Sequence, residues 1–326
     1  MSSQDSAWSL RELFFHRYDK TVEITIISKG NCFEIEIAPA NFSNSPSALE
    51  TYTDLINSMC DEEDYHLTQE AEEDLYIWAL GPFLPIFADF DPNPVNPHPF
   101  TLRDYLHPQI YRYSLFIINE RLEPRLDHTV PNQLLPSGVD LGNFALHPTW
   151  HKMKPENIQL PGTDYNELYS RPPNKVIADN TNCFLKRLES GDRRAATREL
   201  GVYKQIETLG LPNRIQVPRV VGVVEDEEEE SRITGILLTW VQCGYRTLHC
   251  ALKPETSLDL RKRWDTQVTS TVDCLHEAGI IWGDVKADNV LIDHEDNAWK
   301  SRMETVEGDE EGLAQLKEFL YLGKTF

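Results

Sequence analysis

Apolar and polar residues alternate in two neighbouring segments near the start of the chain. The segments TVEITIIS (residues 21–28) and CFEIEIA (residues 32–38) place every second side chain on one face, which is typical of half-buried strands. The intervening KGN has turn chemistry, so the two segments predict a β-hairpin. Ser45 and Pro46 predict a helix start, because proline suits the first helical turn, and residues 68–80 predict a second helix.

The rest of the first half is less regular. Residues 81–100, GPFLPIFADFDPNPVNPHPF, contain so many prolines that we predict a loop or an extended connector. Thr101 and Asp104 form the T-x-x-D pattern of a capping box, which predicts a helix start. Residues 112–126, RYSLFIINERLEPRL, are typical of a strand. None of these patterns carries catalytic chemistry.

The second half predicts a definite order of elements: two short strands, a helix, two strands and a long helix. The acidic run Glu225–Glu230 separates the second pair of strands and is predicted to be a solvated hairpin loop. In the long helix, Thr256 and Asp259 suggest a capping box, and apolar residues from Leu260 to Leu275 recur on one face. The predicted elements are residues 174–178, 183–188, 193–210, 217–224, 233–241 and 256–279.

Composition narrows the class of protein. The 326 residues carry a net charge of −22, which argues against nucleic-acid partners and anionic membranes, because phosphate groups are neutralised by clustered Lys and Arg. The N-terminal sequence MSSQDSAWSL lacks the pattern of a signal peptide, and no apolar run approaches the roughly 20 residues that span a bilayer. None of the six cysteines forms a C-x-x-C pair, so we expect free thiols in a cytoplasmic or nuclear protein.

The long helix is followed at once by IIWGDVKADNVLID, residues 280–293. Asp284, Lys286 and Asn289 form the D-x-K-x-x-N pattern of a phosphoryl-transfer loop. With the preceding elements, this loop resembles the protein-kinase superfamily, and is most similar to fungal proteins with a W-G-D-V-K-x-x-N-V-L-I-D loop. The resemblance implies an α+β, two-lobed fold. Its parts would be an N-terminal α+β accessory region (1–164), a small sheet-plus-helix lobe (165–240) and a truncated helical lobe (241–326).

The resemblance also implies roles for single residues. Asp284 would orient the substrate hydroxyl, Lys286 would steady the transferred phosphate and Asn289 would bind Mg²⁺. Lys186, on a predicted strand, would contact the α- and β-phosphates of ATP. The remaining implied positions are Glu199 as the partner of Lys186 with Glu207 as the fallback, Leu238 as gatekeeper, Trp240 to Gln242 as the adenine hinge, and Asp309 as the buried anchor of the loop backbone.

Three departures from the family pattern weaken the case for an active enzyme. The segment before Lys186 contains no glycine, although kinases have a G-x-G-x-x-G roof over the phosphates. Trp282-Gly283 replaces the usual His-Arg, so regulation by an activation-loop phosphate is not expected. No Asp-Phe-Gly follows the loop, so the principal Mg²⁺ ligand is missing, with Asp293 or Asp296 as the alternative ligands.

Three functions remain open at this point. The first is a degenerate, ATP-binding protein-kinase-like domain with weak or no transfer activity, either a genuine product or a sequence lacking an internal segment of its messenger. The second is an active serine/threonine kinase with an unusual metal site. The third is a small-molecule kinase of the aminoglycoside phosphotransferase type, which Lys286 disfavours. ATP and weakly bound or absent Mg²⁺ are the expected cofactors, and a protein substrate or docking partner is the expected macromolecular partner.

Overall fold

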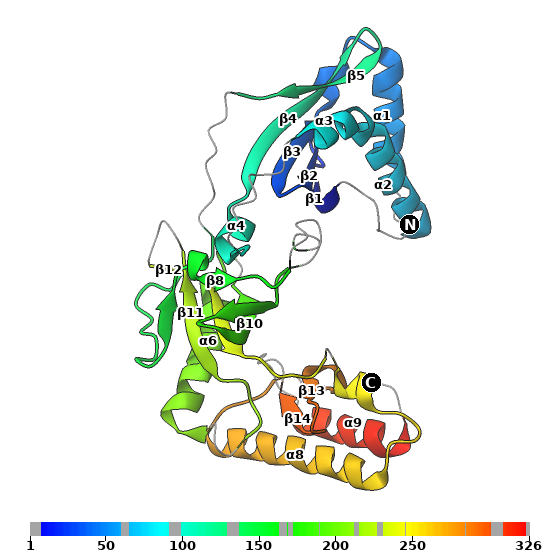
Figure 1. Ribbon diagram of the computed structural model, residues 1–326. Coiled ribbons are helices and arrows are strands. Elements are labelled where there is room, and N and C mark those ends of the chain that lie inside the picture. Colours follow the sequence, from blue (N-terminus) through cyan, green and yellow to red (C-terminus); the bar gives the residue numbers. More distant parts are fainter. Residues whose placement is uncertain are drawn as a thin grey trace. The chain divides into compact units, whose positions relative to one another are not determined.

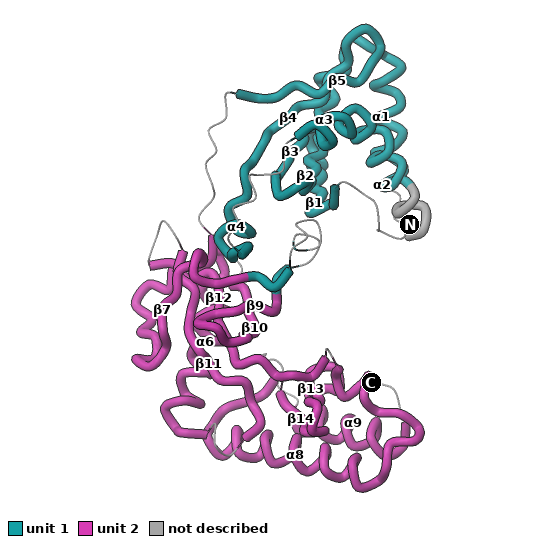
Figure 2. The backbone as a smooth tube through the Cα atoms, in the orientation of Figure 1, with its two compact units in different colours: residues 1–135, 160–173 teal, residues 136–159, 174–326 magenta. Residues whose placement is uncertain are grey.

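A computed structural model of the chain divides into two compact units (Figures 1 and 2). Unit 1 comprises residues 1–135 and 160–173, and unit 2 comprises residues 136–159 and 174–326. Both units combine sheets with helices, so the fold is α+β. The structure describes residues 8–59, 65–90, 99–128, 137–162, 168, 172–188, 190–211, 215–226, 231–244, 246–283, 285–300 and 309–323.

Unit 1 is built on a five-stranded sheet in the order β1-β2-β3-β4-β5. Neighbouring strands are antiparallel except for β3 and β4, which are parallel. The predicted hairpin is confirmed as β2 and β3, and Lys29 and Gly30 at its turn both have positive φ, as a type I′ turn requires. The strands are β1 Ser9–Phe15, β2 Val22–Ser28, β3 Asn31–Ile37, β4 Gln109–Ile118 and β5 Arg121–Leu126.

Helices cover one face of this sheet and enclose the first apolar core. The alternating side chains of β2 and β3 pack in it against buried residues of the helices, which include Tyr52, Ile56, Phe83 and Phe87. The two helices predicted before residue 81 are confirmed. The helical elements of unit 1 are η1 Pro39–Phe42, α1 Pro46–Met59, α2 Tyr65–Leu80, η2 Gly81–Phe83, α3 Leu84–Asp89 and α4 Leu102–Leu106.

Two predictions for unit 1 were wrong. The proline-rich segment is helical from residue 81 to 89, because Pro82 and Pro85 occupy first-turn positions, where the missing N–H costs nothing. Residues 112–126 form two strands rather than one, and the chain reverses at Asn119 and Glu120, which both have positive φ. The capping box of Thr101 with Asp104 is confirmed at the start of α4.

Unit 2 contains a second, larger sheet in the order β7-β11-β12-β10-β9-β8, with β6 paired to β12. The two predicted strand pairs are confirmed, and Asp179 and Asn180 form the positive-φ turn between β9 and β10. The strands are β6 Val139–Asp140, β7 His151–Met153, β8 Ile158–Gln159, β9 Lys175–Ala178, β10 Thr181–Arg187, β11 Val220–Glu225 and β12 Arg232–Thr239; η3 Pro155–Asn157 precedes β8.

The boundary between the units differs from the boundary expected at residue 165. Residues 136–159 belong to unit 2 and supply β6, β7 and β8 to its sheet, while residues 160–173 return to unit 1. The strand β7 is parallel to β11 and lies so close that a Cβ on Gly222 would meet the carbonyl oxygen of His151 at 2.5 Å. The sheet therefore depends on part of the segment assigned by sequence to the accessory region.

The helices of unit 2 pack on the sheet and on one another around a second apolar core (Figure 1). The apolar face of the long helix is confirmed, with Trp264, Val268 and Leu275 buried. Its cap is Ser257, which accepts a hydrogen bond from the N–H of Leu260; the predicted cap Thr256 was wrong by one residue. The remaining elements are α6 Arg193–Thr208, α7 Leu248–Ala251, α8 Leu258–Glu277, η5 Ala287–Asn289, β13 Val290–Ile292, β14 Ala298–Lys300 and α9 Asp309–Leu322.

The fold bears on the expectations for the acidic run, the cysteines and membrane-spanning segments. The acidic run is not fully solvated, because Glu225 and Asp226 are buried and Glu225 pairs with Lys152 at 2.5 Å; residues 227–230 lie outside the described residues. Cys32, Cys183, Cys243, Cys250 and Cys274 are free thiols. In the part of the chain that the structure describes, no helix is both long enough and apolar enough to cross a bilayer.

Candidate functional site

Lys186 and Glu199 meet across unit 2. The ammonium nitrogen of Lys186 on β10 lies 2.5 Å from Oε1 of Glu199 on α6, and their side chains are 27% and 14% exposed. The sequence predicted this partner, and the ion pair confirms that the lysine strand and the following helix face each other. The fallback, Glu207, is not the partner of Lys186.

Local sequence explains why these two side chains converge. Successive residues of a strand point to opposite faces, so Cys183 and Leu185 point to the face opposite that of Phe184 and Lys186. On α6, the cap Asp192 accepts a hydrogen bond from the N–H of Ala195 and fixes the helix start. The buried residues of α6 then face the sheet, and Glu199 stands beside them on the same side; they are Ala196, Leu200, Tyr203 and Ile206.

The D-x-K-x-x-N loop lies between α8 and β13. Asp284, the predicted catalytic residue, lies outside the described residues. Lys286 is partly exposed and precedes a single 3-10 turn, in which the N–H of Asn289 donates to the carbonyl of Lys286 at 2.9 Å. Asn289, the predicted Mg²⁺ ligand, is buried, with 6% of its surface exposed.

Asp309 holds this loop to helix α9. Its carboxylate accepts hydrogen bonds from the backbone N–H groups of Trp282 and Gly283, each at 2.7 Å, and lies 2.8 Å from Nε2 of His276. The side chain is 3% exposed. The predicted role of Asp309 as the buried anchor of the loop backbone is therefore confirmed.

Gly312, one turn further along α9, allows the helix to approach the loop closely. A Cβ at this position would lie 2.5 Å from the carbonyl oxygen of Val285, the residue after Asp284. No side chain fits at that distance without moving backbone. Asp309 and Gly312 together fix the loop against the first two turns of α9.

A buried lysine that the sequence did not single out lies between these two groups. Lys300 on β14 is 2% exposed and is the cross-strand partner of Val290, the residue after Asn289. Its pKa is lowered well below the ordinary value, chiefly by burial, and its amine also senses the charges of Asp309, Lys186 and Glu199. The ion pair and the anchored loop therefore surround one buried amine.

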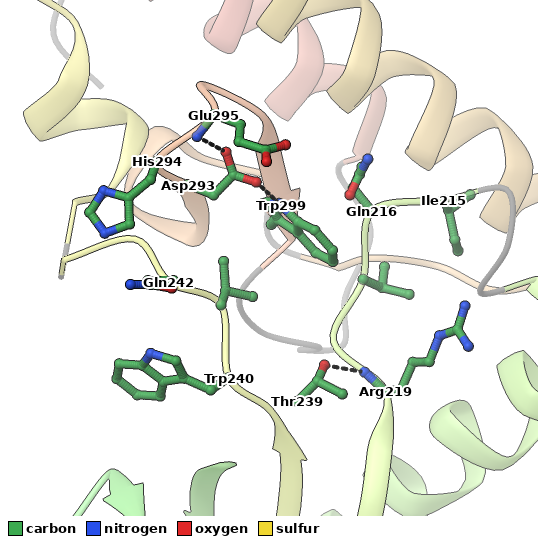
Figure 3. Close-up of a pocket in the computed structure, with 12 residues that line it drawn as sticks. Ile215, Gln216, Arg219, Thr239, Trp240, Gln242, Asp293, His294, Glu295 and Trp299 are labelled. Carbon is green, nitrogen blue, oxygen red and sulfur yellow. Dashed lines mark hydrogen bonds between the residues drawn. The ribbon is translucent and has the colours of Figure 1, made fainter. Parts of the chain in front are cut away.

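The predicted adenine hinge lies at a pocket of about 500 Å³ (Figure 3). Trp240 and Gln242 line it, whereas Leu238 is buried in the core and does not. Lys186, Glu199 and Asn289 do not line this pocket either, so the structure separates the hollow beside the hinge from the ion pair. The lining residues are Ile215, Gln216, Val217, Arg219, Thr239, Trp240, Val241, Gln242, Asp293, His294, Glu295 and Trp299.

The two carboxylates considered as alternative Mg²⁺ ligands already have partners. Asp293 accepts from the N–H groups of Glu295 and Asn297 and from Nε1 of Trp299, at 2.7 to 2.9 Å. Burial acts to raise its pKa, but these hydrogen bonds outweigh burial and hold the pKa below its ordinary value.

Asp296 is engaged as well, because its Oδ1 accepts from Arg246 at 3.0 Å. Asp293 therefore holds the β13–β14 hairpin together, and Asp296 ties the hairpin to Arg246, which precedes α7. Among the described residues, no cluster of three or more His, Cys, Asp or Glu side chains suits a metal.

No family model matches the chain, and no curated protein matches its sequence.

Proposed function

We propose that unit 2 is a protein-kinase-like domain that binds ATP and transfers phosphate weakly or not at all. The ion pair between Lys186 and Glu199 is the observation that carries this proposal. In protein kinases a strand lysine contacts the α- and β-phosphates of ATP, and a glutamate of the next helix positions it. Here the lysine, Lys186, lies on strand β10, and the glutamate, Glu199, lies on α6, the next helix along the chain.

Two further features support the proposal. The elements β9, β10, α6, β11, β12 and α8 precede the loop in the order that the resemblance to kinases implies. Asp309 binds the backbone of the loop two residues before Asp284, as the resemblance also implies.

The same site argues against efficient catalysis. A positioned general base such as Asp284 contributes about 10²- to 10⁴-fold, whereas a bound metal ion contributes several kcal/mol of transition-state stabilisation. The chain has no Asp-Phe-Gly, Asp293 is bound within its hairpin, and Asp296 is bound by Arg246. Since a 10²- to 10⁴-fold effect is about 3 to 5 kcal/mol, the contribution that this site lacks is comparable in size to the one that Asp284 would supply.

Nucleotide affinity is also expected to be low. Phe184 occupies the place of the alanine in the kinase pattern V-A-I-K, two residues before the lysine and on the same face of β10. It is the cross-strand partner of Leu238, so its ring lies on the strand face that leads to the hinge. We expect an ATP dissociation constant near the upper end of the range of about 1 μM to 1 mM that is common for enzyme substrates.

The proposal predicts binding without turnover. Millimolar ATP should raise the thermal unfolding midpoint, because a ligand that binds only the folded state stabilises it by mass action. Radiolabelled phosphate transfer to a generic protein substrate should be no higher for the wild type than for Asp284→Ala, with Asp288→Ala, an exposed residue of the same loop, as the matched control.

The two measurements separate the candidate functions. An unchanged midpoint at millimolar ATP would remove ATP from the function of this protein. A transfer signal that is present in the wild type and in Asp288→Ala but lost in Asp284→Ala would instead establish a working kinase with an unusual metal site.

A further inference from the structure

Lys300 is a buried cation that the proposed function does not use. It ends strand β14 with 2% of its surface exposed, and Nζ lies 4.4 Å from the centre of the Trp282 ring. Within the described ranges, Nζ has no hydrogen-bond acceptor. Buried amines without an acceptor are rare in native proteins, and each one calls for a specific explanation.

The charged groups around this amine show where it lies. Burial lowers its pKa, the carboxylates of Asp309 on α9 and Glu199 on α6 oppose that effect, and the ammonium of Lys186 on β10 reinforces it. Lys300 also contacts the loop directly, because it is the cross-strand partner of Val290 and its amine lies over Trp282, whose N–H donates to Asp309.

A divalent cation would normally neutralise phosphate charge in this region of a phosphoryl-transfer site. The carboxylates nearest in sequence already have partners: Asp293 accepts from donors of its own hairpin, and Asp296 accepts from Arg246. The amine of Lys300 lies beside this loop, and protonation of that amine on binding of an anion would supply the positive charge. An anion carried by the ligand would supply the acceptor that Lys300 lacks.

We propose that Lys300 takes the place of the divalent cation, so that this protein binds the phosphates of a nucleoside triphosphate between Lys186 and Lys300 without requiring Mg²⁺. The inference rests on the proposed function, because it assigns the phosphates to the side chain of Lys186. It adds a ligand residue and a metal-free mode of binding that the family pattern does not contain.

The test is ATP binding in EDTA, measured by isothermal titration calorimetry on the full chain. The wild type should bind ATP in EDTA within about threefold of its affinity in excess Mg²⁺. Lys300→Met should weaken the binding in EDTA by about tenfold to a hundredfold, the effect of losing one hydrogen bond to a charged group. Lys300→Arg keeps the charge and should retain most of the affinity, and Lys262→Met, on the exposed side of α8, should bind as the wild type does.

The outcomes distinguish the inference from the function on which it rests. Binding that requires Mg²⁺, or equal affinities of wild type and Lys300→Met in EDTA, would overturn the role of Lys300 and leave ATP binding standing. No binding in either buffer would overturn the proposed function itself, and the inference with it. Unfolding curves recorded for each variant show whether a loss of affinity reflects a loss of folded protein.

Discussion

Asp309→Ala is expected to destabilise unit 2 by about 3 to 5 kcal/mol, the typical result of removing one partner from a buried, charged hydrogen-bond network. The substitution leaves the buried N–H groups of Trp282 and Gly283 without an acceptor and removes the partner of His276. Thermal and urea unfolding followed by tryptophan fluorescence report mainly on unit 2, because five of the seven tryptophans lie there.

The neighbouring residue provides the control for this prediction. Glu310 is exposed in the same helical turn, so Glu310→Ala should cost no more than the roughly 0.3 to 1 kcal/mol of a helix-dipole interaction. If the two variants unfold alike, the hydrogen bonds of Asp309 do not hold the loop.

A second variant tests the same anchor through packing. Gly312→Ala forces α9 away from Val285 and should cost about 1 to 3 kcal/mol, the usual result of overpacking. Its matched control is Gly201→Ala in α6, where the nearest atom, in the ring of Phe144, is 4.0 Å from the new Cβ. That change should instead stabilise by about 0.5 to 1 kcal/mol, because alanine favours helix interiors.

Lys300→Met is expected to stabilise the unliganded protein at neutral pH. Replacing a buried charge with an apolar side chain of similar length typically stabilises by about 1 to 4 kcal/mol, which for a unit of this size raises the unfolding midpoint by several degrees. Lys262→Met is the surface control and should leave the midpoint unchanged within a degree or so.

The difference in stability between Lys300→Met and the wild type should shrink as the pH rises. The pKa of Lys300 is lower in the folded state than its ordinary value of 10.5, so in the window between those two values the unfolded chain binds more protons. The stability of the wild type therefore rises with pH through that window relative to Lys300→Met, and the advantage of the variant disappears near pH 10.5. An advantage that is constant or grows with pH would mean that Lys300 is not a buried, destabilised cation.

Much of the candidate site could be predicted from local sequence. The alternation of residues 183–188 puts Lys186 on one face of a strand, and the helical period of residues 193–210 limits its partners to a few side chains. Asp309 could be predicted because its family position follows from the spacing around the loop. In each case the deciding information lies within about 30 residues or in a motif.

Other features of the fold, such as the exact helix cap and the pairing of distant strands, depend on contacts that local sequence does not encode. Ser257 and Thr256 are adjacent hydroxyl residues, and only the backbone angles at the helix start decide which one caps it. The strands β6 and β7 pair with β12 and β11 across some 70 residues or more, and the local signal of this pairing is Gly222, a strand glycine at a close backbone approach.

The burial of Lys300 is a further feature that local sequence does not predict. Its type and its place next to Trp299 are typical of an exposed lysine at the end of a hairpin, and lysine is almost never fully buried unless it is paired. Only the packing of β14 on α8 and of the Lys300 amine over Trp282 removes it from water. A burial that contradicts residue type is the kind of signal that becomes visible only in three dimensions.

One titration tests whether Lys186, Glu199 and the loop converge on a nucleotide site. ATP is titrated into the wild type, into Lys186→Met and into Lys175→Met, a lysine of the adjacent strand whose ammonium lies over the Trp240 ring. We predict measurable binding by the wild type, a loss of at least about tenfold in Lys186→Met and a smaller change in Lys175→Met. Equal affinities of the wild type and Lys186→Met, with both proteins folded, would contradict a nucleotide site at this ion pair.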